Sequence, residues 1–174
     1  MAHAPVSLSK ARLDVEGLVL PNGLRVAHAT AEGENLSQAD EAPFVKGSGP
    51  VHLSLEINQQ DLQAFLATQA PAELSGMSLQ VTPAGIGVAG VFRAMLPLPF
   101  TALCQLEIVG GQKMFVRLSS IQVMGLSPSS LVQAQLDKIN PVFDASELPV
   151  NLTLKGAELK MGSIHVTGEL NLSQ

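Results

Sequence analysis

A sparsely charged stretch from Leu74 to Met124 constrains the fold of this chain more than any other feature. It is rich in strand-forming residues, and turn signals at Pro83-Ala84-Gly85 and Gly110-Gly111 divide it into successive strands. Arg93 is the only charged residue between Leu74 and Leu106. The second face of these strands carries mostly Gly, Ala, Ser, Thr and Gln. The pattern predicts an antiparallel meander that is either poorly charged on its wet face or partly covered on both faces.

The expected strands are long for a chain of 174 residues. Residues 101–109 would span roughly 30 Å and residues 112–124 roughly 40 Å, at about 3.3 Å per residue. A compact domain of this length has a diameter of roughly 40 Å. Strands as long as the molecule must twist and coil, and the concave face of the sheet then needs an apolar filler. That filler would be a helix or a bound ligand.

Two short amphipathic helices are predicted, over residues 59–69 and 128–139. Asn58 is expected to cap the first, with Asp61 completing a capping box. Ser127-Pro128 is expected to open the second. The predicted fold class is α+β with strands dominant: a strongly coiled antiparallel sheet, a meander or roll of at least seven strands, wrapped around the two helices.

The rest of the chain is expected to extend this sheet within one domain spanning residues 1–174. Residues 6–30 predict a hairpin around Pro21-Asn22-Gly23, and residues 150–174 predict a second hairpin. Residues 32–46 predict a solvated acidic loop. Two prolines within Leu96–Phe100 predict an exposed edge or a bend.

Composition excludes several classes of protein. Apolar residues make up 46% of the chain and charged residues only 14%, which is too apolar for a disordered protein. A net charge of −5, scattered basic residues and the absence of Trp and Tyr argue against a nucleic-acid partner. The N-terminus shows no apolar core typical of an export signal. We therefore expect a cytoplasmic protein or one peripheral to the inner membrane.

The chain shows no recognisable catalytic chemistry. It contains no G-x-S-x-G, HExxH, P-loop or G-x-G-x-x-G sequence with the required context. His3, His28, His52 and His165 are interpreted as ordinary surface residues, and Cys104 as a buried, inert thiol. A single cysteine also excludes an intramolecular disulfide and a cysteine-based metal cluster. We predict a protein that is not an enzyme and needs neither a metal nor a cofactor.

The inward phases of the predicted strands and helices identify candidate residues for lining a cavity. They are Leu53, Leu55, Leu62, Phe65, Leu79, Val81, Val88, Leu106, Val132, Leu136, Ile164 and Val166. A second candidate is an apolar tip that enters a membrane or gates the cavity, formed by Met95, Leu96, Leu98 and Phe100. The alternative for the tip is an edge strand packed against a helix. Physical reasoning alone favours a solid core over a cavity.

Three segments carry a resemblance to a known family. They are INQQDLQAFL at residues 57–66, the meander, and LDKINP at residues 136–141 followed by Leu148-Pro149. With the N-terminal hairpin, they make residues 6–172 similar to the bacterial LmeA-like family, formerly a domain of unknown function. The resemblance implies a tubular lipid-binding fold, like one half of the bactericidal/permeability-increasing protein. It also implies an apolar cavity that binds phospholipid and a role in the cell envelope, but no catalytic residues.

We therefore predict non-enzymatic binding of a phospholipid or another acyl-chain ligand in an apolar cavity, with lipid transfer or envelope maintenance as its purpose. The partners expected are this ligand and a membrane surface in peripheral contact. The alternative is a scaffold protein with a solid core and a sheet edge or apolar tip that docks a partner. A hydrolase with an unrecognised site ranks last. The sequence predicts no oligomeric state.

Overall fold

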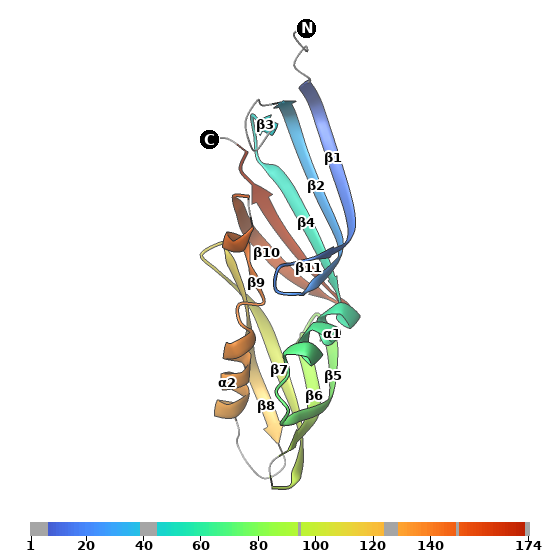
Figure 1. The fold of residues 1–174 in the computed structure, drawn as a ribbon, viewed down its shortest axis with the longest axis vertical. Coiled ribbons are helices and arrows are strands. Elements are labelled where there is room, and N and C mark those ends of the chain that lie inside the picture. The colour runs from blue at the N-terminus through green and yellow to red at the C-terminus, as the bar shows by residue number, and fades with distance from the viewer. Residues whose placement is uncertain (1–6, 39–44, 94, 124–128, 149, 173–174) are drawn as a thin grey trace.

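The computed structural model describes residues 7–38, 45–93, 95–123, 129–148 and 150–172. Within these residues the protein is mostly β, with two short helices. Two antiparallel sheets lie end to end and make the molecule elongated (Figure 1). The predicted single sheet is therefore divided into two, because the long strands are placed one set after the other along the molecule.

Sheet A occupies the end that holds both termini (Figure 1). Its strand order is β1-β2-β4-β11-β10, with the short β3 also pairing with β2. The bounds are β1 Ser7–Val19, β2 Arg25–Gln38, β3 Val45–Gly47, β4 Val51–Asn58, β10 Leu152–Lys160 and β11 Ser163–Leu170. The predicted N-terminal and C-terminal hairpins are both confirmed. The prediction of an acidic loop is wrong for residues 32–38, since β2 continues through them.

Sheet B contains the meander that dominates the sequence. Its order is β5-β6-β7-β8-β9. The bounds are β5 Leu74–Thr82, β6 Gly85–Arg93, β7 Pro97–Val109, β8 Lys113–Val123 and β9 Phe143–Asp144. Gly110 and Gly111 form the turn between β7 and β8 with φ of 61° and 66°, a backbone conformation that glycine adopts at little cost. The predicted turns of the meander are confirmed.

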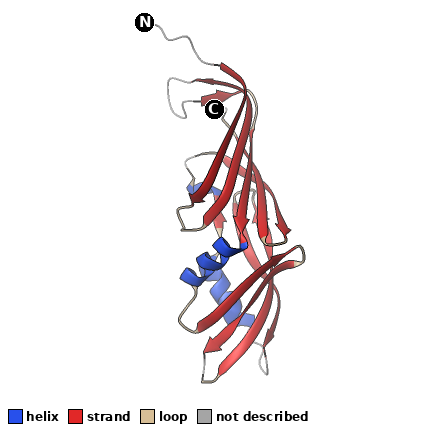
Figure 2. Ribbon diagram, turned by 90° about the vertical axis from the view of Figure 1, so that its right-hand side faces the viewer, coloured by secondary structure: helices blue, strands red, loops and turns tan. Residues whose placement is uncertain are grey.

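Both predicted helices are present, as α1 Gln59–Gln69 and α2 Ser129–Ile139. α1 packs against β5, at one edge of sheet B, and α2 packs against β8, towards the other edge. Sheet B curls around the two helices, whereas sheet A is flatter (Figure 2). A single-turn 3-10 helix, η1 Ala145–Glu147, follows β9.

The start of α1 differs from the predicted capping box. Asn58 has the extended conformation of a cap residue, but its side chain makes no capping hydrogen bond. Asp61 pairs instead with Arg25 of β2, with 3.3 Å between Nη1 and Oδ1. The predicted cap of α2, Ser127-Pro128, lies outside the described residues. The N–H of Gln59, the first residue of α1, donates instead to the carbonyl of Gly162 in sheet A's β10–β11 turn at 2.9 Å.

A packed core joins the two sheets where they meet. Its largest fully buried side chains include Ile57 and Ile164 from sheet A and Val81, Ile86 and Met114 from sheet B. Main-chain hydrogen bonds also cross this junction. The N–H of Gly162, in the β10–β11 turn, donates to the carbonyl of Val81 at 2.9 Å, and the N–H of Val81 donates to Oε1 of Gln59 at 2.8 Å. The first bond ties sheet B to sheet A, the second ties it to α1, and both satisfy backbone groups at the β5 edge.

Asn140 fastens the end of α2 to sheet B. Its side-chain amide donates to the carbonyl of Val116 and accepts from the N–H of Val116, each at 2.8 Å. The amide thus pairs with β8 much as another strand residue would. The helix itself ends one residue earlier, at Ile139. The additional effect is to hold α2 at a defined position over β8.

Candidate functional site

An apolar cleft lies between the two helices and the concave face of sheet B. Its volume is about 310 Å³, at the lower end of the range of small-molecule sites. α1 and the residues after it form one wall, α2 forms the opposite wall, and β6 and β7 form the floor. Several lining side chains, including Val88, Phe92 and Leu136, are only half-buried, so the cleft is partly open to solvent.

Among the described residues that line the cleft, none is charged. Gln69 and Gln135 are its two amide side chains, one on each helix. The other lining residues are Leu66, Ala70, Pro71, Leu74, Met77, Val88, Phe92, Leu98, Phe100, Ala102, Cys104, Val123, Val132, Leu136 and Ile139. A surface of this composition suits a hydrocarbon chain, since an ionised group would lose its hydration without gaining a partner of opposite charge.

Strand alternation places these side chains on one face of the sheet. Leu98, Phe100, Ala102 and Cys104 alternate along β7, and all four point into the cleft. Phe100 is also the residue of β7 that pairs with Val123, at the end of β8. Before Phe100, β7 pairs with β6 as far as Pro97, and the positions that would continue β8 beside it lie outside the described residues, so the edge predicted from the two prolines stays a prediction.

Two irregularities shape the side of the cleft near β5. The pairing of β5 with β6 shifts between Ser75 and Ser78, around Gly76 with φ of 58°. The shift allows Leu74 and Met77, three positions apart, to face the same side. At Gly90 of β6, a Cβ atom would come within 3.0 Å of the Phe100 ring and 3.2 Å of Met77. Glycine at this position lets both side chains approach across the strand.

The structure brings together only some of the residues predicted to line a cavity. Val88, Val132 and Leu136 line the cleft. Leu53 and Leu106 are partly buried against the core. The other seven lie in the packed core: Leu55, Leu62, Phe65, Leu79, Val81, Ile164 and Val166.

The residues of the predicted tip also separate into two pairs. Leu98 and Phe100 line the cleft, with Phe100 buried. Met95 and Leu96 project from the turn before β7, with exposures of 102% and 70%. The exposed apolar pair therefore adjoins the cleft along the chain.

Sequence reasoning missed most of the cleft lining. Gln69 and Ala70 were not expected to contribute, because the end of α1 looks like an ordinary polar helix terminus. Ala102 and Cys104 are in the same phase as Phe100, so alternation could have identified them. Their small size is what leaves space above the floor. Burial raises the pKa of the Cys104 thiol to about 11, which confirms a buried thiol that stays protonated at neutral pH.

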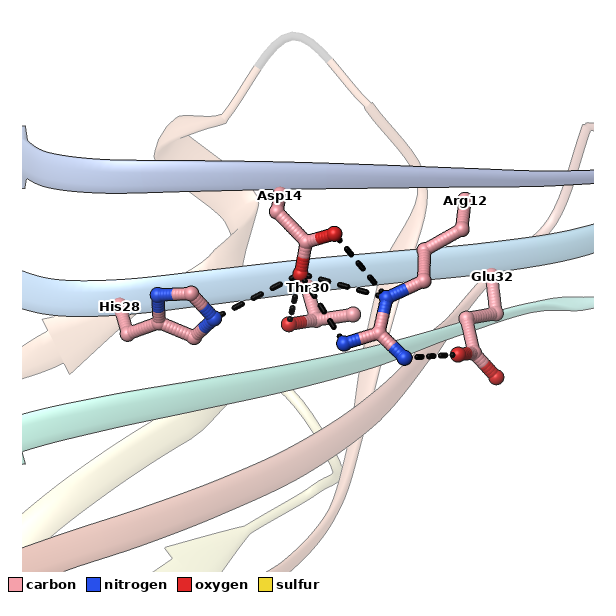
Figure 3. Close-up of polar contacts among 5 residues, drawn as sticks. All are labelled: Arg12, Asp14, His28, Thr30 and Glu32. Atoms are coloured by element: carbon pink, nitrogen blue, oxygen red, sulfur yellow. Dashed lines mark hydrogen bonds and ion pairs between the residues drawn. The ribbon is translucent and has the colours of Figure 1, made fainter.

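The outer face of sheet A is, by contrast, a polar surface. Asp14 accepts hydrogen bonds from Arg12 and from the hydroxyl of Thr30, and Arg12 also binds Glu32 at 2.9 Å (Figure 3). His28 Nε2 lies 3.5 Å from Asp14 Oδ1. These contacts, chiefly the hydrogen bond from Arg12, lower the pKa of Asp14. All of these side chains are paired across β1 and β2 in a solvated surface network.

The polar groups of the described residues form no recognisable catalytic arrangement. Ser163 Oγ lies 3.1 Å from His165 Nε2, but neither residue lines the apolar cleft. Within the described part of the chain, no three His, Cys, Asp or Glu side chains gather as metal ligands would. Neither α1 nor α2 is long and apolar enough to cross a membrane, nor is any other described helix.

Comparison with known proteins yields one match. A family model described as LmeA-like phospholipid-binding matches residues 7–169, which includes both sheets, both helices and the entire cleft lining. No curated protein and no solved structure gives a significant match.

Proposed function

The chain belongs to the LmeA-like phospholipid-binding family, and on this premise we propose that it binds an acyl chain of a phospholipid in the cleft between its helices and sheet B. The observation that carries this proposal is the uncharged lining of a cleft that is already formed. The fold corresponds, in this proposal, to a tubular lipid-binding module in which the curled sheet and helices hold the ligand. The protein binds its ligand and performs no reaction on it.

The lining also indicates how the ligand would lie. Hydrocarbon leaving water is stabilised by about 25 cal/mol per Å² of buried apolar surface. A phosphate has no cation to meet among the lining residues that the structure describes, so the headgroup remains outside the cleft. The amides of Gln69 and Gln135 are the polar groups available along the walls. The protein would therefore select for the chain more than for the headgroup.

The exposed pair Met95 and Leu96 serves, in this proposal, as a membrane-contacting tip at the entrance to the cleft. Leu98 and Phe100 follow in the same chain segment and line the cleft, so one segment joins the bilayer to the binding site. Arg93, whose Nε donates to Ser75 Oγ at 3.1 Å, lies just before the tip and is exposed. Its charge suits an anionic lipid surface.

The central test is whether purified protein carries lipid and whether filling the cleft removes it. Native mass spectrometry with extraction should detect an acyl-chain ligand. Delipidation should lower the melting temperature, because a ligand bound only by the native state stabilises that state by mass action. Val88→Trp should fill the cleft and reduce bound lipid while changing stability little.

Val81→Trp is the matched control, since Val81 is only 1% exposed in the packed core. Overpacking there should destabilise the protein by about 1–3 kcal/mol. The proposal is wrong if the delipidated and untreated proteins melt alike and Val88→Trp is as destabilising as Val81→Trp. The scaffold function, with a solid core and a partner-binding edge, would then replace it.

The tip is tested separately with Leu96→Asp. Leu96 is largely exposed, so the change should leave the melting temperature almost unaltered while weakening sedimentation with anionic liposomes. Leu98→Asp should in addition reduce acyl-chain binding, because Leu98 lines the cleft. Undiminished liposome binding by Leu96→Asp would exclude the tip without excluding the cleft.

A further inference from the structure

The outer edge of sheet A is formed by β1, a strand of 13 residues. Among the described residues, β1 pairs with β2 alone, so its other side is open. An open edge presents unpaired N–H and C=O groups that can accept another strand. Leu8, Leu13, Leu18 and Val19 on this strand are 40–62% exposed. The edge is therefore both long and partly apolar.

The charges of β1 are divided between its two halves. Lys10 and Arg12 precede Leu13, and Asp14 and Glu16 follow it. Alternation places all four on one face of the strand, as the contacts of Arg12 with Asp14 show (Figure 3). If a second copy of β1 ran antiparallel with Leu13 opposite Leu13, each of these charged residues would face a residue of opposite charge. Lys10 would then lie opposite Glu16, Arg12 opposite Asp14, and Leu8 opposite Leu18.

Other registers are less favourable. A shift of two residues in one direction places Arg12 opposite Arg12, and in the other direction it places Asp14 opposite Asp14; like charges directly opposite are destabilising. A shift of one residue places the charged side chains of one copy beside the side chains of the other copy's opposite face, on the same side of the joined sheet. The Leu13-centred register thus has four opposite-charge pairs and no like-charge pair, whereas each two-residue shift leaves two opposite-charge pairs and adds one like-charge pair.

We propose that β1 is a homodimer interface, in which two copies pair antiparallel about a two-fold axis at Leu13 and join their A sheets into one. The interface is isologous, so each favourable cross-strand pair occurs twice. Because β1 runs along the long axis of the molecule, antiparallel pairing places the two cleft-bearing halves at opposite ends of the dimer (Figure 1). This arrangement does not depend on what the cleft binds.

Cysteine cross-linking tests the register directly. Residues opposite each other in an antiparallel pair have Cα atoms about 4.5–5.5 Å apart, within the range that a disulfide spans. Leu13→Cys should therefore give a covalent dimer under mild oxidation. Leu18→Cys is the matched control on the same strand, since the two copies of residue 18 would be roughly 33 Å apart at ten residues of separation. The native Cys104 is buried and should not react.

Charge exchange tests the pairing without a cross-link. Arg12→Asp and Asp14→Arg should each raise the dissociation constant of the dimer about tenfold, because two attractive pairs become repulsive. Mixing the two variants should restore a heterodimer, and the double variant R12D/D14R should restore a homodimer. Sedimentation velocity over a range of concentrations measures all four, and circular dichroism checks that each variant is folded.

The proposal is overturned if the wild-type protein sediments as a monomer at every concentration tested. It is equally overturned if the single variants dimerise like the wild type, which would place any dimer contact on another surface. Equal cross-linking of Leu13→Cys and Leu18→Cys would exclude the Leu13-centred register.

Discussion

The junction of the two sheets and the far half of sheet B follow the same alternating pattern, yet one is solid and the other is hollow. At the junction, Ile57, Phe65, Val81, Ile86 and Ile164 fill the space between the sheets and α1. Beyond it, the helices pack on β5 and β8, towards opposite edges of sheet B, and leave the floor between them uncovered.

The floor of the cleft is hollow partly because its residues are small. Val88, Ala102 and Cys104 line the floor with small side chains, where larger ones would fill the space below the helices. Apolar side chains facing a cleft lack the packing partners that their equivalents have in a core. The comparison teaches that strand alternation predicts which side chains face inward. It does not predict whether they meet other side chains, as in a core, or line a cleft.

The largest expected difference comes from one substitution made in each region. Phe65→Ala removes a ring that is 5% exposed at the junction and should destabilise the protein by about 3–5 kcal/mol. Phe92→Ala, in the cleft lining, should cost less than half as much in delipidated protein, because that ring already borders empty space. Urea unfolding measures both. Equal losses would mean that the cleft is packed as tightly as the junction.

The anchor of α2 should have the next largest effect. Asn140→Ala removes two hydrogen bonds to Val116 and leaves two backbone groups unpaired, for a loss of about 1–3 kcal/mol. Loss of the anchor should also weaken acyl-chain binding, since α2 forms a wall of the cleft. Gln133→Ala, on the same helix, removes only a surface bond to Asp137 and should change stability by less than about 0.5 kcal/mol.

If Asn140→Ala bound acyl chains as tightly as the wild type, α2 would not need this anchor to form the cleft. Binding can be measured by displacement of a fluorescent fatty acid, alongside urea unfolding of the same preparations.

The smallest expected effect concerns the polar face of sheet A. The pKa of Asp14 in the folded protein lies below its ordinary value of 3.8, chiefly because Arg12 donates hydrogen bonds to it. Ionised Asp14 therefore stabilises the fold above about pH 4, and this contribution is lost as pH falls through its lowered folded-state pKa. Asp14→Asn should have a slightly lower melting temperature than the wild type at pH 7, and the difference in melting temperature should vanish at low pH.

The measurement is a series of thermal melts from pH 7 to pH 2, at protein concentrations low enough to keep both proteins monomeric. Added salt should also reduce the difference, since the network is exposed. A difference that grows as the pH falls would contradict the direction assigned to the Asp14 pKa.

Much of the secondary structure could be predicted, because its causes are local. The alternation of apolar and polar residues along 97–109 and 113–123 specifies strands, whichever elements pack on the sheet. Gly110-Gly111 specifies the turn between them. The helical stripes of α1 and α2 are also local, and both helices were predicted to within one residue. The strand in residues 32–38 was missed because its acidic residues resemble a loop until β1 pairs with it on one side and β3 pairs with residues 36–38 on the other.

The sequence by itself determined which face of each strand and helix is apolar, through the period of its residues. Only the tertiary structure decided which of them meet. Val81 and Val88, on the facing strands β5 and β6, had the same predicted role, yet Val81 lies in the core and Val88 in the cleft. The physical reason is that a cavity depends on the distance between elements. That distance is set by long-range contacts such as Asn140 with Val116 and Val81 with Gly162, which no local pattern encodes.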